Sequence, residues 1–360
     1  MGTEIKRKLA SIQRVEEVRN IENADAIQAY RVLGWWVVDK KDAHKVGDLV
    51  VYLSLDSWVP HELAPFLSKG HEPREYNGVK GERLRTIKLR GTTSQGLLLK
   101  TNQLEFAIET KTIGPDSSAV LRIENLDHEG ADLTEILGIQ KWEAPIPAQL
   151  QGQAAGMFPS WGRKTDQERC QNIWDEIQQH IGKGTKFEAT IKLDGSSASY
   201  GLSPEGEYVA CSRNLSLKTD QEDNTFVNAG RKYDLETKLK ELGRPLMISG
   251  ELCGPGIQKN QEGLKDHQLF VFDVYDPITM SYLPSSERFQ IVNKLGLQHV
   301  PVIHQWVALD ELGIQTLEDL LNFAEGPSLN SNQREGVVFK AVDGSFSFKA
   351  ISNKWLLKNE

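Results

Sequence analysis

The chain has 360 residues, 39% of them hydrophobic, and a formal net charge of −8. This composition is typical of a soluble globular protein with two or three domains, and no apolar run approaches the ~18 residues that a membrane span needs. The net negative charge excludes indiscriminate binding of a polyanion, so any contact with nucleic acid must come from local basic patches.

The cysteines and the N-terminal residues indicate the cellular compartment. Cys170, Cys211 and Cys253 are far apart and form no C-x-x-C pair, which predicts neither a disulfide framework nor a zinc site and favours a reducing, cytoplasmic compartment. The first six residues lack the apolar core of a secretory signal. Arg7 stands where a myristoylation signal needs Ser or Thr, so we expect no membrane partner.

The first 145 residues contain several short runs of β-branched and aromatic residues separated by polar or glycine turns. Residues 31–38 are expected to form one strand, residues 49–53 another, and residues 83–90 and 96–100 a further pair. Short strands with few helical patterns predict a small closed β-barrel of the oligonucleotide-binding (OB) type.

Four cations lie on the expected strand 83–90. A β-bulge near Thr86 would turn Leu84, Ile87 and Leu89 inward and all four cations outward. Such a surface suits a phosphate backbone, although an ordinary solvated strand face has the same pattern. The candidate nucleic-acid-binding residues are Arg83, Arg85, Lys88 and Arg90.

A connector is expected between the barrel and the rest of the chain. Residues 104–108 are amphipathic, and Ala144-Pro145-Ile146-Pro147 stiffens the chain and ends the unit. We therefore expect a first domain over residues 1–145 and a second over residues 146–360.

The second domain opens with an expected capped helix from about residue 165, on which Arg169 could meet a ligand. Next comes a β-prone run that ends in Lys192, followed by Asp194 and a turn. Burial on a strand disfavours the ammonium form, which predicts a lowered pKa for Lys192 and a neutral, nucleophilic amine near pH 7. A plain Lys192–Asp194 ion pair in a hairpin would explain the same residues.

Three later apolar strands carry acids, namely Glu251, Asp273 and Glu335, and a last strand carries Lys349. Each acid alone is typical of a strand end or a salt bridge. Together with a lysine nucleophile and Arg213, they form a set suited to phosphoryl or nucleotidyl transfer with a hard divalent cation.

The order of these residues resembles motifs I, Ia, III, IIIa, IV and V of the covalent nucleotidyltransferases, the superfamily of polynucleotide ligases and mRNA capping enzymes. The matching motifs are Lys192-Leu193-Asp194-Gly195, Arg213, Gly250-Glu251-Leu252, Phe272-Asp273, Glu335-Gly336-Val337-Val338 and Lys349. Residues 250–260 are similar to the RNA ligase 2 type, and the resemblance extends from about Lys164 to Lys358.

The position of the barrel in the chain indicates which family of this superfamily the sequence resembles. DNA ligases and capping enzymes carry an OB domain after motif V, whereas here only eleven residues follow Lys349 and the barrel comes first. With residues 84–91 and 94–96, this order resembles the RNA ligase 5 family. The implied fold class is α+β, with an OB-type barrel followed by an ATP-grasp-like nucleotidyltransferase domain of antiparallel sheets and flanking helices.

The resemblance implies a role for each site residue. Lys192 would attack the α-phosphate of ATP, and Asp194, Asp273 and Glu335 would hold Mg²⁺ or Mn²⁺ through its waters. Phe272 would stack on adenine. The residues expected to contact the nucleotide are Arg169, Arg213, Glu251, Phe272, Lys340 and Lys349, besides Lys192. The catalytic set would be Lys192, Asp194, Arg213, Glu251, Glu335 and Lys349.

One departure from the family concerns motif V, where related ligases often have two lysines as K-x-K. Here Ser347 stands two residues before Lys349 and Ile351 two after it. Lys340 or Lys354 would then have to supply the second cation.

The expected function is an ATP-dependent RNA ligase that acts, as a monomer, on nicked duplexes with an RNA 3′-OH strand. Two alternatives stay open: a capping-type guanylyltransferase, which would use GTP, and a non-catalytic RNA- or tRNA-binding protein built on the barrel. A Schiff-base lysine enzyme has no support from the barrel or from the several acids.

Overall fold

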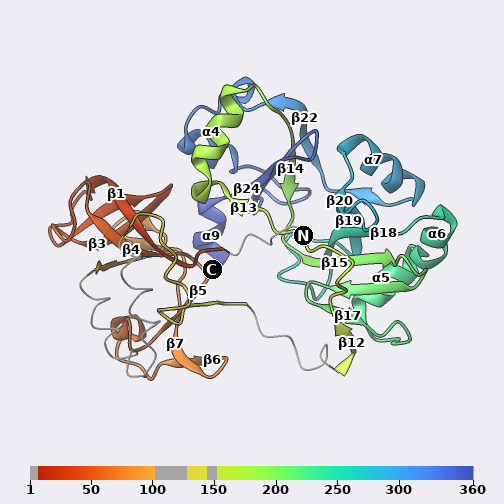
Figure 1. Cartoon of the computed structure of the whole chain (residues 1–360), viewed down its shortest axis with the longest axis horizontal. Coiled ribbons are helices and arrows are strands. Elements are labelled where there is room, and N and C mark those ends of the chain that lie inside the picture. The colour runs from red at the N-terminus through yellow and green to blue at the C-terminus, as the bar shows by residue number, and fades with distance from the viewer. Residues whose placement is uncertain (1–6, 102–127, 144–151, 360) are drawn as a thin grey trace. The chain divides into compact units, whose positions relative to one another are not determined.

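The computed structural model describes residues 7–101, 128–143 and 152–359. The connector residues 104–108 and the expected linker 144–147 lie outside the described residues. Two compact units make up the chain, residues 1–145 with 357–360 and residues 146–356 (Figure 1). None of the helices in the described ranges has the length and apolar character needed to cross a bilayer.

An antiparallel five-stranded sheet forms one part of the first unit, in the order β10-β4-β1-β2-β3. Its strands are β1 (Ala10–Asn20), β2 (Ile27–Val32), β3 (Trp35–Lys40), β4 (Leu49–Leu53) and β10 (Leu97–Lys100). The long strand β1 pairs with β4 through its first half and with β2 through its second half, with a register shift between Val15 and Glu17. A bulge of this kind bends one strand so that it can serve both sides of a barrel.

A second sheet of this unit has the order β11-β5-β7-β6, and β8 pairs with β9 as a two-stranded ribbon. The elements are β5 (Ser57–Pro60), η1 (Pro65–Ser68), β6 (Arg74–Tyr76), β7 (Val79–Arg83), β8 (Ile87–Leu89), β9 (Thr92–Ser94) and β11 (Gln140–Lys141). The backbone N–H of Val38 on β3 donates to Ser94 Oγ at 2.9 Å, which ties the ribbon to the first sheet. These elements confirm the predicted OB-type barrel.

Two local expectations for the barrel are wrong. Residues 31–38 are not one strand, because Leu33 (φ 53°) and Gly34 turn the chain between β2 and β3. The cation-rich segment is interrupted between β7 and β8, and Ile87 and Leu89 are 47% and 36% exposed instead of inward. Among the described residues β8 pairs with β9 alone, and all three residues of β8 are exposed.

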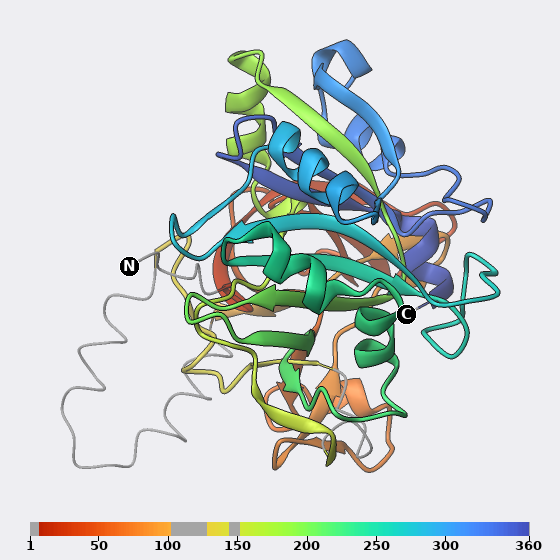
Figure 2. The ribbon, with the colours of Figure 1, turned by 90° about the vertical axis from the view of Figure 1, so that its right-hand side faces the viewer.

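The larger sheet of the second unit has the order β12-β17-β16-β15-β18-β19-β20 and is antiparallel along that path, and β21 adds to β19 in parallel. The strands are β12 (Ala154–Met157), β15 (Ser196–Leu202), β16 (Tyr208–Ser212), β17 (Leu215–Leu217), β18 (Leu246–Cys253), β19 (Gln268–Asp276), β20 (Ser281–Tyr282) and β21 (Gln298–His299). Apolar residues of α5 (Thr225–Lys232), α6 (Leu235–Leu242) and α7 (Ser285–Lys294) pack on it in one core cluster. Figure 2 shows these helices in front of the sheet.

The smaller sheet has the order β13-β24-β23-β14-β22, with β13 parallel to β24. Its strands are β13 (Glu168–Arg169), β14 (Lys186–Lys192), β22 (Val302–Ala308), β23 (Gly336–Ala341) and β24 (Ser347–Ile351). Helices α4 (Trp174–Gly182) and α8 (Leu317–Phe323) share its core, and η2 (Cys170–Asn172), η3 (Asp310–Leu312) and α9 (Asn353–Asn359) complete the chain.

The helix expected from about residue 165 starts later than predicted. Residues 168–169 form β13, and α4 begins at Trp174 after Ile173, which makes no side-chain cap. Pairing of β13 with β24, distant in sequence, overrides the local capping pattern. Arg169 is therefore a strand residue.

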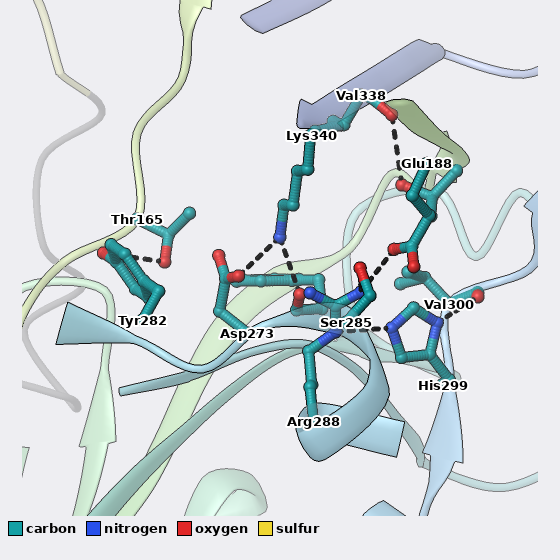
Figure 3. Close-up of polar contacts among 12 residues, drawn as sticks. Thr165, Glu188, Asp273, Tyr282, Ser285, Arg288, His299, Val300, Val338 and Lys340 are labelled. Carbon is teal, nitrogen blue, oxygen red and sulfur yellow. Dashed lines mark hydrogen bonds and ion pairs between the residues drawn. The ribbon is translucent and has the colours of Figure 1, made fainter. Parts of the chain in front are cut away.

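A buried polar network joins the two sheets of the second unit (Figure 3). Arg288 of α7 pairs with Glu188 of β14, each 2% exposed, and its Nε donates to His299 Nε2 at 3.0 Å. Burial lowers the pKa of His299 to about 3, so this imidazole is neutral and can accept that hydrogen bond. In the same region Lys340 of β23 donates to Asp273 Oδ1 of β19 at 2.6 Å.

Removing one partner of the buried pair should be costly. Arg288→Met should lower the free energy of unfolding by about 3–5 kcal/mol, because the Glu188 carboxylate stays buried without its cation. Urea unfolding measures this loss. The control Arg244→Met removes the pair with Glu287, whose side chains are both 40% exposed, and should cost under about 1 kcal/mol. The double variant Glu188→Gln/Arg288→Met should recover part of the loss. Equal losses of stability in Arg288→Met and in the control Arg244→Met would contradict this account.

Candidate active site

The nucleophile candidate Lys192 is the last residue of β14, and its neighbour strand supplies its ion-pair partner. Antiparallel pairing places Lys192 opposite Gly336, so Glu335, just before β23, lies beside it. Lys192 Nζ is 2.7 Å from Glu335 Oε2, and the two side chains are 28% and 13% exposed. A Cβ at position 336 would lie 2.2 Å from the carbonyl oxygen of Ala350, so only glycine permits this close strand packing.

Two further carboxylates reach the same place through the turn that follows β14. Asp194 and Gly195 carry the chain from the smaller sheet into β15 of the larger one. There β15 pairs with β18 so that Ser197 is opposite Glu251, and the N–H of Gly195 donates to Glu251 Oε1 at 3.1 Å. The structure thus brings together four predicted catalytic residues, Lys192, Asp194, Glu251 and Glu335.

Burial and the neighbouring charges shift the pKa values of Lys192, Asp194 and Glu251. Burial, reinforced by Glu335, raises the pKa of Asp194 to about 6 and that of Glu251 to about 7. Burial alone would lower the pKa of Lys192, but Glu335, Glu251 and Asp194 together raise it above its usual value. The predicted lowering is therefore wrong for the free chain, because that prediction counted desolvation without the surrounding carboxylates.

A second group of predicted residues gathers around an acid that the sequence did not reveal. Parallel pairing of β13 with β24 sets Arg169 opposite Lys349. Lys349 Nζ is 2.8 Å from Asp166 Oδ1, and the guanidinium of Arg213 is within 4.0 Å of Asp166 Oδ2. Burial, with Lys192 and Arg169 nearby, lowers the pKa of Lys349 although Asp166 opposes this. No motif marks Asp166, since its role depends on a pairing between residues about 180 positions apart.

Asp273, Phe272 and Lys340 form a third group. Lys340 Nζ donates to Asp273 Oδ1 and to the carbonyl oxygen of Phe272, both at 2.6 Å (Figure 3). Lys340 lies across the strand ladder from Ser347, the position where related ligases often have a lysine. In the free chain its charge is paired with the Asp273 carboxylate. Phe272 is half-buried and packs against the cluster that contains Leu193.

The acidic side chains of this site could hold a divalent cation either directly or through water. In the described ranges no three or more His, Cys, Asp and Glu side chains are placed to hold a metal directly. The predicted triad of Asp194, Asp273 and Glu335 would hold the cation through its waters and not directly, and Asp273 also lies 2.6 Å from Lys340 Nζ. Asp194 and Glu335 still offer carboxylate oxygens, which suit Mg²⁺ that keeps its own waters.

Cavity size does not identify the site. A surface cavity of about 350 Å³ is lined by residues of α5 together with Asp266 and His267, none of which belongs to the predicted set. The shifted pKa values of Lys192, Asp194 and Glu251, which lie close together, are the stronger indication of function.

Within the first unit, Arg83 differs from the other three predicted nucleic-acid-binding residues because its side chain is largely buried. Arg83 is 17% exposed, 2.5 Å from Asp56 Oδ1, and its guanidinium lies 3.9 Å from the ring centroid of Trp142. This internal pair and stack remove Arg83 from the exposed face. Arg85, Lys88 and Arg90 are exposed.

Comparisons with known proteins identify the family of this chain. Residues 185–355 match the RNA ligase family, and residues 9–101 match an OB-fold domain family. The chain also resembles solved structures of Naegleria gruberi RNA ligase, and each match covers 98% of this chain and 99% of the other. The structures are a variant with AMP and Mn and a variant with ATP and Mn, both at 39% sequence identity, and the ligase with PPi at 40% identity. The TM-score is 0.84 in all three cases. A comparison with curated protein sequences gave no match.

Fold, site and comparisons together define a nucleotidyltransferase-type ligase with an N-terminal OB domain. The chain belongs to the RNA ligase family.

The raised pKa of Glu251 predicts a pH-dependent stability. The folded chain keeps this proton up to about pH 7, whereas the unfolded chain loses it near pH 4, so stability falls as pH rises through about 7. Glu251→Gln keeps the acceptor for Gly195 but cannot ionise. Its Tm should therefore rise relative to the unmodified chain between pH 5 and 8, by roughly 2–4 °C per kcal/mol.

The matched control for this measurement is Glu311→Gln. A hydrogen bond from Lys186 holds the pKa of Glu311 below its usual range, so its Tm difference should stay flat over the same pH interval. A flat profile for Glu251→Gln would contradict the raised pKa.

Proposed function

We propose that this chain is an ATP-dependent RNA ligase that forms a lysyl-AMP at Lys192 and seals 3′-OH/5′-phosphate nicks in duplexes with an RNA 3′-OH strand. The observation that carries the proposal is the 2.7 Å contact between Lys192 and Glu335 inside the acidic cluster. The relatives contain ATP, AMP and PPi, which are the substrate and products of an adenylate transfer.

In the first step, Lys192 Nζ attacks the α-phosphorus of ATP. A P–N bond forms, the bond from the α-phosphorus to the bridging oxygen breaks, and pyrophosphate leaves. The ammonium must lose one proton beforehand, and Glu335, at 2.7 Å, is placed to receive it. The nitrogen loses a second proton as the P–N bond forms, and that proton leaves with the pyrophosphate. Arg213 and Lys349 lie close enough together to neutralise phosphate oxygens.

The divalent cation, Mg²⁺ or Mn²⁺, would be held through water by Asp194 and Glu335. When bound, it would supply positive charge that lowers the pKa of Lys192 and of the neighbouring carboxyl groups. Asp273, which pairs with Lys340 in the free chain, is proposed as the third carboxylate of that water shell. Glu251 is assigned to the sugar and Phe272 to the adenine ring.

In the second step, a 5′-phosphate oxygen of the RNA attacks the lysine-bound phosphorus, which breaks the P–N bond and returns Lys192 as an amine. In the third step, the 3′-hydroxyl attacks the activated 5′-phosphate, forms the phosphodiester and expels AMP. The exposed residues Arg85, Lys88 and Arg90 of the barrel would hold phosphates of the duplex. The enzyme is proposed to act as a monomer.

Lys192→Ala should abolish covalent labelling of the protein by ATP carrying ³²P at the α-position, because it removes the amine proposed to form the P–N bond. Labelling is measured after denaturing electrophoresis. Lys186→Ala, on the same strand but exposed and paired with Glu311, is the matched control and should label normally. Covalent AMP on the Lys192→Ala protein would mean that the nucleophile is another residue.

The same assay separates the alternatives. Labelling by GTP but not ATP would favour a capping-type guanylyltransferase. No labelling by either nucleotide, combined with RNA binding that Lys192→Ala leaves unchanged, would favour a non-catalytic RNA-binding protein.

Removing the barrel cations should impair sealing of a nick more than adenylation. For the triple variant Arg85→Ala/Lys88→Ala/Arg90→Ala we expect weaker binding of nicked duplex RNA and a slope of log K against log salt reduced by roughly one unit per lost phosphate contact. The control Lys41→Ala/Lys45→Ala/Lys69→Ala has the same charge change at other exposed positions of the barrel unit. If both triple variants weakened binding equally, the effect would come from net charge and not from phosphate contacts of Arg85, Lys88 and Arg90.

A further inference from the structure

Asp166 lies between two of the cations that the proposed function gives to ATP. It belongs to the segment just before β13, and its side chain is 50% exposed. One carboxylate oxygen is 2.8 Å from Lys349 Nζ and the other is within 4.0 Å of the Arg213 guanidinium. Lys349 itself is only 18% exposed, and Arg169 is its neighbour across the ladder.

Asp166 offers Lys349 and Arg213 the same kind of anionic oxygen that a phosphate would offer. A carboxylate and a phosphate both present anionic oxygens to the same N–H donors, and Lys349 and Arg213 have donors only. Three cations from β13, β24 and the end of β16 would repel one another if no anion lay among them. In the free chain, Asp166 supplies part of that negative charge.

We propose that Asp166 is an internal substitute for a nucleotide phosphate: it holds Lys349 and Arg213 in place in the free enzyme and gives them up when ATP binds. This inference rests on the proposed function and adds a residue that controls nucleotide affinity. ATP then has to break an ion pair that is already formed, so its apparent affinity is lower than the two cations alone would provide.

The size of the effect follows from the exposure of the pair. Ion pairs that water can reach contribute about 0.2–1 kcal/mol, so removing the charge of Asp166 should tighten ATP binding by at most about fivefold. We expect a gain of about two- to fivefold. A residue that merely supports the structure would give the opposite sign, because its loss weakens binding.

The test measures binding without catalysis. In the Lys192→Ala background, which cannot form the covalent adduct, titration calorimetry with ATP and with pyrophosphate should give a two- to fivefold lower Kd for Asp166→Asn. Binding of adenosine, which has no phosphate, should not change. The control Asp175→Asn, an exposed acid on α4, has the same charge change and should leave all three affinities unaltered.

Each outcome decides the matter. Unchanged or weaker binding of ATP by Asp166→Asn, or an equal gain in Asp175→Asn, would overturn the inference. Asp166→Glu restores the charge and should return the Kd to that of the parent; a Kd as low as that of Asp166→Asn would also overturn it. Absence of ATP binding by the parent together with absence of labelling in the unmodified chain would instead overturn the proposed function, and the inference with it.

Discussion

The site depends on one electrostatic arrangement, a lysine ammonium surrounded by the carboxylates of Asp194, Glu251 and Glu335. Any of these charges would be unfavourable if buried alone, and together they partly compensate one another. The backbone is arranged to meet this constraint. The ladder of β14 with β23 brings Glu335 to Lys192, and the turn into β15 followed by the ladder with β18 brings Glu251 to Gly195.

The second unit separates its charges into two groups. The acidic cluster surrounds the nucleophile, whereas Arg169, Arg213 and Lys349 gather around Asp166. The pKa shifts have opposite directions in the two groups: carboxyl pKa values rise beside Lys192, and the pKa of Lys349 falls. A substrate that brings phosphate oxygens to the cations and a divalent ion to the acids would relieve both kinds of repulsion.

The network of Glu188, Arg288 and His299, with the pair of Lys340 and Asp273, joins the two sheets of the second unit. The Lys340–Asp273 pair is a contact that the sequence did not predict. An acid within an apolar strand and a lysine near a motif have the same local pattern whether they bind a substrate or each other. Only the packing of β19 against β23 decides between these two possibilities.

By itself, the sequence determined the barrel, the two-part organisation and the order of motifs around Lys192. These features depend on local alternation, turns and residue types, which a linear chain displays directly. The tertiary structure alone decided which charges meet: it introduced Asp166, moved Arg83 into an internal pair, exposed Ile87 and Leu89, and reversed the direction of the Lys192 pKa shift. The physical reason is that the energy of a charge depends on neighbours that strand pairing brings from distant parts of the chain.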